Sequence, residues 1–570
     1  MIASLHFSRL QNNNYSVFIS IVLSLFLLIN IYLYKSTNLY IIFVIMFVII
    51  YTINRPNRIS QMFINSLILF STLRLIFFAS THFKILPFID TYWDLAVVRT
   101  FIDSERIFSI SDYKGGISPL EGYSRWPLLH IYEYIGVHIT GIDPIILHMT
   151  NLLFIGSLPL LTIYIIIRLI YMRLNLPKEF VYIALIVSAT LPDMIYWSLQ
   201  LIRNTFAWVY VILIIFLLLK YYKKPPHASF LSILLLSISA VLSHHWSSSM
   251  LLLLVGGAYL IVRYKPKISS KSLSLTFILI ISVVLLVWLL YYANILFEMV
   301  NFSRVVSRVS TVDIVERFAP RFPPELTPPL LIAILRIKTL LTYAPIIAGG
   351  YLLYRFTKSS NKEYVIVVFF LYTSGIILAA FNLIINLEPT RVIMLLIPLF
   401  ITSLSIFYTS LYSRYRYSIY ILVPFVVTTS FIGIFSHSIV PLHLYTNIVN
   451  PLDVGEHSNN LYFSNYFSKI DLAATNSIFS DDTEVLAMLL DTSQLHKIEK
   501  LSQQSLNKEF FYYHRDRIIV ITKDFLVYRY GGGGLSYISY DDSLQFKDVF
   551  KQEIKGTNLI YNDSYSTIYQ

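Results

Sequence analysis

Residues 143–170 read DPIILHMTNLLFIGSLPLLTIYIIIRLI, a long apolar run in which only Asp143 and Arg168 carry a full charge. A helix needs about 20 apolar residues to cross the roughly 30 Å hydrocarbon core of a bilayer. Comparable runs recur along the chain, which is 56% hydrophobic and only 13% charged. Soluble proteins carry roughly 25% charged residues. The sequence therefore predicts a polytopic α-helical membrane protein.

The apolar runs divide into about thirteen predicted transmembrane helices. They lie near residues 16–34, 39–53, 62–80, 143–170, 179–198, 205–222, 228–243, 246–263, 273–297, 331–354, 364–386, 391–411 and 417–438. The second run is short for a crossing, which favours a tilted or partly interfacial helix. No cleavable signal peptide is expected, because a polar stretch precedes the first run and other runs follow at once.

Basic residues orient this array, since cytoplasmic loops of membrane proteins are enriched in Lys and Arg. With a cytoplasmic N-terminus, the loops predicted inside hold Arg55, Arg58, Arg168, Arg173, Lys178, Lys220, Lys223, Lys224, Arg263, Lys265, Lys267, Lys271, Arg355, Lys358, Lys362, Arg414 and Arg416. The short connections predicted outside hold only Lys35, Arg203 and Arg391. These loops account for the net charge of +12, so no nucleic-acid partner is expected.

Two long connections, residues 81–143 and 298–330, fall on the outer side. The first contains two amphipathic stretches, Trp93–Ile107 and Trp126–Ile139, which are expected to lie in the membrane interface as helices. Residues 1–440 are thus predicted to form a transmembrane domain that carries both loops.

After residue 440 the long apolar runs stop, so residues 441–570 are predicted to form a small extracytoplasmic α/β domain. Strand-like segments occur at Arg517–Thr522 and Phe525–Tyr530, and a hairpin-like pattern joins Leu559–Tyr561 to Ser566–Tyr569. The Gly531–Gly534 run lacks the following Lys-Ser/Thr of a phosphate-binding loop, so a turn is expected there. The chain contains no cysteine, which excludes disulfides, thiolate metal sites and a cysteine nucleophile.

Charged and polar residues gather where the connections meet the outer face, and charge beside a bilayer tends to mark function. Five connections contribute Asp90 and Asp94; Asp193 and Arg203; His244 and His245; Glu316, Arg317 and Arg321; and Glu388 and Arg391. Structural alternatives exist for several of them. Asp90 is suited to cap a helix beginning at Thr91, the histidines to anchor a helix end, and Glu388 to pair with Arg391.

Short motifs accompany this cluster. They are Asp90-Thr91-Tyr92-Trp93-Asp94-Leu95, Tyr123-Ser124-Arg125-Trp126-Pro127, Gly141-Ile142-Asp143, His244-His245, Glu388-Pro389-Thr390-Arg391, and a tail with Ile560-Tyr561-Asn562-Asp563 and Ile568-Tyr569. With them, most of the chain resembles the GT-C membrane glycosyltransferases, which use polyprenyl-phosphate-linked sugars, and most of all their archaeal members. The resemblance implies a GT-C-like fold with Asp90 as catalytic base. No Trp-Trp pair occurs, which disfavours whole-glycan transfer to asparagine.

The predicted function is transfer of a single sugar, with inversion, from a polyprenyl-phosphate donor to a glycan, lipid or protein acceptor on the outer face of the cell membrane. A carboxylate suits removal of the acceptor proton, which makes Asp90 the first candidate and Asp94 the second. An arginine fork suits the phosphate, with Arg391 first and Arg203, Arg317 and Arg321 behind it. His244, His245, Glu316 and Glu388 complete the predicted substrate site.

No cofactor is assigned; a divalent cation held by Asp90, Asp94 and a histidine is an alternative. A rival function is a transporter or flippase for a lipid-linked or anionic solute. Transporters place polar groups near mid-membrane, whereas the span centres here are almost free of charge. An inactive scaffold that displays the tail is a third interpretation.

The orientation is testable by thiol labelling in intact cells, since the native chain offers no cysteine background. Single cysteines replacing Lys114 and Ser536 are expected to react with an impermeant reagent, while one replacing Ser359 stays unlabelled. Labelling of the Ser359 variant together with silence of the Ser536 variant would reverse the orientation.

Overall fold

The computed structural model describes these residues: 21–22, 24, 45–46, 48–49, 58–80, 89–105, 124–199, 201–221, 227–263, 275–292, 347–358, 363–384, 389–414, 422, 424–429, 478–480, 498–500, 518–522, 528–531, 534–537, 559–562 and 566–569. The helices are α3 Ile59–Ser80, α4 Ile89–Ser104, α6 Leu128–Thr140, α7 Pro144–Ile155, α8 Leu158–Leu174, α9 Lys178–Thr190, α10 Pro192–Ser198, α11 Arg203–Lys220, α12 His227–Ser243, α13 His245–Arg263, α14 Leu275–Val287, α18 Glu363–Ile384 and α19 Pro389–Arg414. A short π-helix, η3 Trp288–Tyr292, continues α14.

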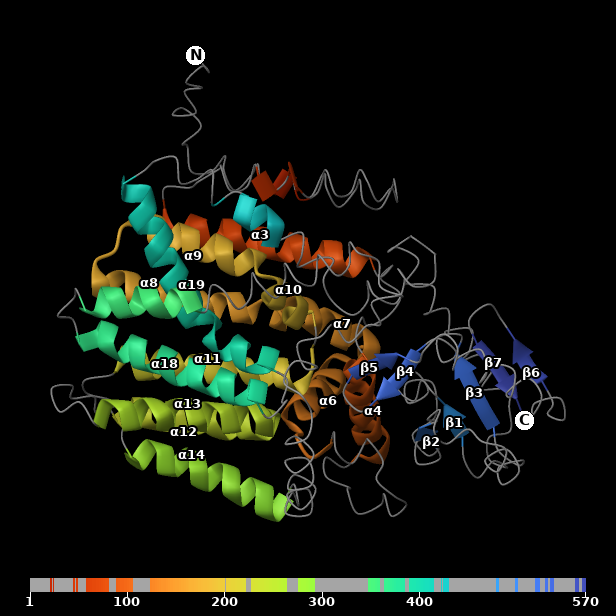
Figure 1. The fold of residues 1–570 in the computed structure, drawn as a ribbon. Helices are drawn as coiled ribbons and strands as arrows, with labels where there is room; N and C mark the ends of the chain where they lie inside the picture. Colours follow the sequence, from red (N-terminus) through yellow and green to blue (C-terminus); the bar gives the residue numbers. More distant parts are fainter. Residues whose placement is uncertain are drawn as a thin grey trace.

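Long helices lie side by side in one bundle, while α4 and α6 stand across one end of it (Figure 1). Four described segments are long and apolar enough to cross a membrane: Ile59–Ile76, Pro144–Leu174, Arg203–Lys220 and Trp246–Arg263. Shorter apolar helices lie at Ser229–Ser243, Leu275–Leu290, Glu363–Ile377 and Ile397–Thr409. The predicted multi-pass helical architecture is confirmed, and the number of thirteen helices stays a prediction.

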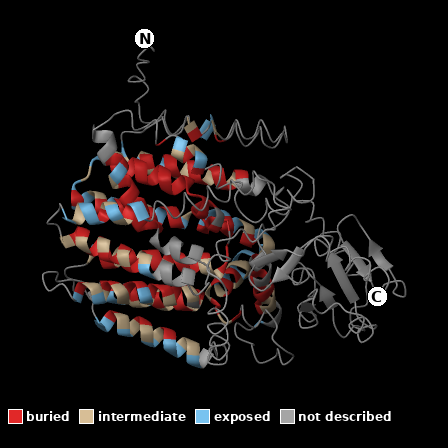
Figure 2. Ribbon diagram, viewed as in Figure 1, coloured by how far each residue is buried: buried red, intermediate tan, exposed pale blue. Residues whose placement is uncertain are grey.

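Burial divides the bundle into a centre and a lipid-facing rim (Figure 2). All residues from Phe180 to Thr190 in α9 are buried, and this helix contacts α3, α8 and α19. On α14, by contrast, Leu275, Leu279 and Val283 are exposed. Exposed apolar side chains on a membrane helix are expected to face lipid, so α14 lies at the rim.

The predicted span at residues 143–170 is interrupted, since α7 ends at Ile155 and α8 begins at Leu158. A buried arginine from α3 occupies this interruption. The Arg74 guanidinium donates from Nη1 to the Leu153 carbonyl at 3.0 Å and to Ser157 Oγ at 2.9 Å. Its Nη2 donates to the carbonyls of Leu152 and Ser198, the latter at 2.9 Å. Arg74 therefore caps the C-terminal ends of both α7 and α10.

Arg74 is a charged residue inside the apolar helix α3, where it is only 1% exposed. It is an exception to the expectation that the centres of the transmembrane helices are nearly free of charge. Carbonyl groups at a helix C-terminus carry partial negative charge and attract a cation. Buried charge is tolerated where it is hydrogen-bonded, as both terminal nitrogens of Arg74 are, whereas its Nε has no described partner. The arginine thus has a structural reason to lie inside the bundle.

Four strands in the tail, β3, β4, β6 and β7, overlap the predicted segments, whereas β1, β2 and β5 were not predicted. Five form a mixed sheet in the order β2-β1-β3-β7-β6, from β1 Ile478–Ser480, β2 Ile498–Lys500, β3 Ile518–Thr522, β6 Leu559–Asn562 and β7 Ser566–Tyr569. β1 runs parallel to β2 and β3, whereas β7 is antiparallel to β3 and β6. The β6–β7 pairing agrees with the predicted terminal hairpin. A separate extracytoplasmic α/β domain over residues 441–570 stays a prediction.

The glycine run forms a hairpin turn. β4 Tyr528–Gly531 pairs antiparallel with β5 Gly534–Tyr537, with Gly531 opposite Gly534. A phosphate-binding loop joins a strand to a helix. Here both flanks are strands, which agrees with the predicted turn.

Replacing Gly156 by Ala is expected to destabilise the protein. A Cβ atom at this position would lie 2.1 Å from Arg74 Nη2 and 2.1 Å from the Ser198 carbonyl oxygen, so the Arg74 cap must shift. Overpacking of this kind costs about 1–3 kcal/mol. Gly256 in α13 is the matched control, because a Cβ there has no neighbour within 4 Å. Thermal unfolding in detergent should show a lower Tm for Gly156→Ala alone; equal Tm values for both variants would contradict the close packing.

Candidate active site

Asp94 lies on α4 with 0% exposure and is held by two other helices. His130 Nε2 on α6 is 2.8 Å from Asp94 Oδ1, and Arg203 Nε at the start of α11 forms an ion pair with the same oxygen at 2.9 Å. The second carboxylate oxygen, Oδ2, makes no hydrogen bond with any residue that the structure describes. The carboxylate is therefore oriented through Oδ1, and Oδ2 is a buried acceptor without a described donor, which is costly to leave unpaired.

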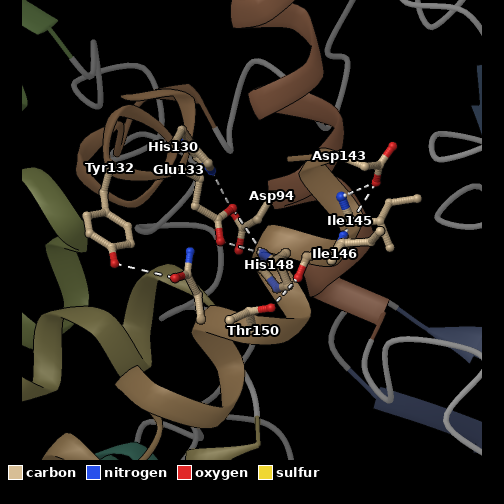
Figure 3. Close-up of polar contacts among 10 residues, drawn as sticks. Asp94, His130, Tyr132, Glu133, Asp143, Ile145, Ile146, His148 and Thr150 are labelled. Atoms are coloured by element: carbon tan, nitrogen blue, oxygen red, sulfur yellow. Dashed lines mark hydrogen bonds and ion pairs between the residues drawn. The ribbon is translucent and has the colours of Figure 1, made fainter. Parts of the chain in front are cut away.

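A second buried carboxylate belongs to Glu133, which lies on α6 about one turn after His130. Glu133 is 1% exposed, and its Oε1 and Oε2 lie 2.7 and 2.9 Å from Nδ1 of His148 on α7. His148 is fully buried. Figure 3 shows the side chains of Asp94, His130, Glu133 and His148 pointing into the same space between α4, α6 and α7. Two carboxylate–imidazole pairs thus occupy the junction of these three helices.

The turn between α6 and α7 is fixed by local chemistry. Gly141 ends α6 in the left-handed conformation, with a φ of 65°. The Asp143 side chain then accepts hydrogen bonds from the backbone N–H groups of Ile145 and Ile146, and Pro144 occupies the first helical position. Proline after an Asp cap is a strong helix start. The turn therefore returns the chain so that His148 faces Glu133.

Tyr132 connects α6 to two further elements. Its hydroxyl donates to Asn151 Oδ1 of α7 at 3.4 Å, and its ring packs against Phe206 of α11 with centroids 5.7 Å apart. Burial raises the pKa of Tyr132, and the neighbouring Glu133 carboxylate raises it further, so the hydroxyl stays protonated as a donor. α6 is thereby linked to the helix that begins with Arg203.

The start of α11 also meets the junction between α12 and α13. Asn204 Oδ1 accepts a hydrogen bond from Ser247 Oγ at 2.6 Å. His244, which is 6% exposed, stands between the last residue of α12 and the first residue of α13. Asp193 is buried in the first turn of α10, where a negative charge is favourable. Of these residues, His244 lies between two helices, whereas Asp193 and Asn204 lie in the first turns of α10 and α11.

The structure brings together part of the predicted cluster. Asp94 and Arg203 form an ion pair, although they lie far apart in the chain. Asp90, His245 and Arg391 fall in α4, α13 and α19, but their side chains are outside the described residues. Asp90 is the second residue of α4, which begins at Ile89 and not at Thr91. Glu316, Arg317, Arg321 and Glu388 lie wholly outside the described residues.

His130, Glu133 and His148 were not among the residues predicted from the sequence. The available signal was the spacing of three between polar residues on each helix, His130 with Glu133 and His148 with Asn151, because such residues share a helix face. Within the described part of the chain, no three His, Cys, Asp or Glu side chains gather as a metal-binding group. The divalent-cation alternative depends on Asp90, whose side chain is not among them.

No protein-family profile matches this chain, and no curated protein matches it in sequence. Among solved structures, ArnT from Cupriavidus metallidurans bound to undecaprenyl phosphate is similar, with a TM-score of 0.50 at 10% sequence identity. The similarity covers 88% of this chain and 97% of ArnT. ArnT in the apo state gives a TM-score of 0.44 at 11% identity over the same shares. This chain is therefore a multi-pass membrane protein whose overall fold is similar to that of ArnT.

Proposed function

We propose that the chain is a membrane glycosyltransferase that moves one sugar from a polyprenyl-phosphate donor to an acceptor hydroxyl at the outer face of the membrane. The observation that carries this function is the carboxylate of Asp94, buried, fixed through Oδ1 and without a described partner at Oδ2. The ArnT-like fold supports it, since ArnT was solved with undecaprenyl phosphate. The archaeal likeness, the identity of the sugar and the outward orientation are further expectations of the same proposal.

In this reaction the acceptor oxygen attacks the anomeric carbon, and the bond from that carbon to the phosphate oxygen breaks. The electron pair leaves with the polyprenyl phosphate, and the acceptor proton passes to Asp94 Oδ2. Asp90 lies four residues earlier on the same face of α4 and is the alternative base.

The phosphate is expected at the start of α11. Arg203 is the first residue of this helix, and its side chain remains 13% exposed beside Asp94. The preceding residue, Ile202, supplies no side-chain cap to the helix. Backbone N–H groups at a helix N-terminus and an arginine fork both favour phosphate. Arg391 is the second candidate for this contact, and His244 is a candidate hydrogen-bond donor.

The rival transporter function predicts polar groups within the span centres that are available to a solute. Arg74 is a charge inside a transmembrane helix, but both terminal nitrogens of its guanidinium are bonded to backbone carbonyls. Its contacts close the ends of two helices. Arg74 therefore does not favour transport.

Replacing Asp94 by Asn is expected to lower kcat by about a hundredfold or more, because the amide keeps the shape of the carboxylate and cannot accept the proton. The measurement is transfer from a purified polyprenyl-phosphate sugar, with folding checked by gel filtration. Asp90→Asn is assayed beside it. Full turnover of Asp94→Asn with an inactive Asp90→Asn moves the base to Asp90; full turnover of both variants contradicts a carboxylate base on α4.

Replacing Arg203 by Lys is expected to weaken donor binding by about 1–3 kcal/mol, since lysine keeps the charge and loses the planar fork. Binding of polyprenyl phosphate to the purified protein measures this effect apart from turnover. Arg168→Lys is the matched control, because Arg168 lies exposed on α8. Unchanged affinity in Arg203→Lys, with a loss in Arg391→Lys, assigns the phosphate contact to Arg391.

A further inference from the structure

α6 buries two polar side chains together with one apolar side chain. The buried residues of this helix are Leu129, His130 and Glu133. Ile135 and Ile139, on other sides of the helix, are 46% and 78% exposed. The polar contacts of the buried face therefore act together with the packing of Leu129 to set the rotation of α6 about its axis.

The two polar contacts hold different neighbours. His130 contacts Asp94 of α4, and Glu133 contacts His148 of α7. Residues three apart lie on one helix face and move together when the helix turns about its axis. A rotation that separates Glu133 from His148 therefore also withdraws His130 from Asp94. The Glu133–His148 contact fixes the direction in which His130 points.

Close packing between α6 and α7 restricts other movements of α6 relative to α7. A Cβ atom on Gly136 would lie 2.8 Å from Leu147 Cδ2, so the two helices are in close contact at this point. The backbone turn at Gly141 and the Asp143 cap set where α7 begins. His148 is fully buried, and its Nε2 makes no hydrogen bond with a described residue, so Nδ1 makes its polar contact to Glu133. The pair is a defined link between two helices.

We infer that Glu133 and His148 are a positioning pair for the proposed base. They set the rotation of α6, which places His130 against Asp94 Oδ1 and leaves Oδ2 toward the acceptor. Neither residue touches the reacting atoms, so they act on the rate through the orientation of Asp94. This inference rests on the proposed function and adds two residues, from α6 and α7, to its machinery.

The kinetic test compares Glu133→Ala, His148→Ala and the double variant. A misplacement of about 1 Å in a reacting group costs up to a hundredfold in rate. Each single variant is expected to lower kcat by about tenfold or more, with the donor KM within about twofold. The double variant should be no slower than the single ones, because contacting residues are not additive.

Conservative variants separate positioning from general destabilisation. The amide nitrogen of Asn occupies about the place of His Nδ1, so His148→Asn should restore kcat to within about threefold of the native value where His148→Ala does not. Glu133→Gln keeps an oxygen toward His148 and should behave likewise. Tyr134→Phe is the control on the same helix, since its hydroxyl makes only an exposed contact to His138. Failure of both conservative variants to restore kcat overturns the positioning role.

A spin label gives a readout that needs no activity. The label replaces Ile135, on the exposed face of α6, in the cysteine-free chain. Its mobility should rise in Glu133→Ala and His148→Ala, and stay native-like in His148→Asn. Unchanged mobility in both alanine variants overturns the inference whether or not transfer is detected. An inactive Asp94→Asn beside a fully active Glu133→Ala rejects the positioning pair alone, whereas fully active Asp94→Asn rejects the proposed base.

Discussion

The guanidinium of Arg74 donates hydrogen bonds to backbone carbonyls at the ends of two helices inside the bundle. No water is available in the hydrocarbon core, so each unpaired carbonyl costs several kcal/mol. The interruption between α7 and α8 frees the Leu153 carbonyl from its helix, and Ser157 N–H bonds instead to the Phe154 carbonyl. Arg74 Nη1 and Ser157 Oγ both donate to Leu153 in compensation. Gly156 permits the arginine to approach, because any side chain there meets it.

This cap lies at the ends of α7 and α10, two segments that lead to residues of the candidate site. α7 ends at the cap and carries His148 on its buried side. α10 also ends at the cap, with the Ser198 carbonyl bonded to Arg74, and α11 begins five residues later with Arg203. One side chain of α3 therefore sets where two separate segments stop.

Apolar runs and turn chemistry made most of the architecture predictable. Runs of suitable length located the long helices, and period-two patterns with Asn, Asp, Ser and Gly turns located the strands β3, β4, β6 and β7. The sequence predicted that Asp94 and Arg203 lie on the same side of the membrane. It could not predict their contact, because a sequence gives no distance between residues in different connections.

The burial of His130 and Glu133 could not be predicted from the amphipathic pattern alone. An amphipathic stretch such as Trp126–Ile139 predicts a helix at the membrane interface, and the polar face of such a helix normally faces water. In the structure His130 and Glu133 are buried, while Ile135 and Ile139 are exposed. The direction of the stripe depends on partners from α4 and α7, which lie in other parts of the sequence. The structural role of Arg74 was not predicted for the same reason, since a hydropathy pattern does not show which carbonyl groups will contact a side chain.

The inverted setting of α6 has a consequence for chemistry. Exposed apolar side chains such as Ile135 and Ile139 suit contact with lipid, and the buried His130 and Glu133 lie where bulk water is excluded. Electrostatic interactions strengthen as the surroundings become less polar. A single arginine beside Asp94 then acts strongly on whichever anion it contacts, the carboxylate or a phosphate. α6 thus exposes Ile135 and Ile139 and buries His130 and Glu133. This arrangement suits the proposed reaction between a lipid-borne phosphate and an acceptor at the membrane surface.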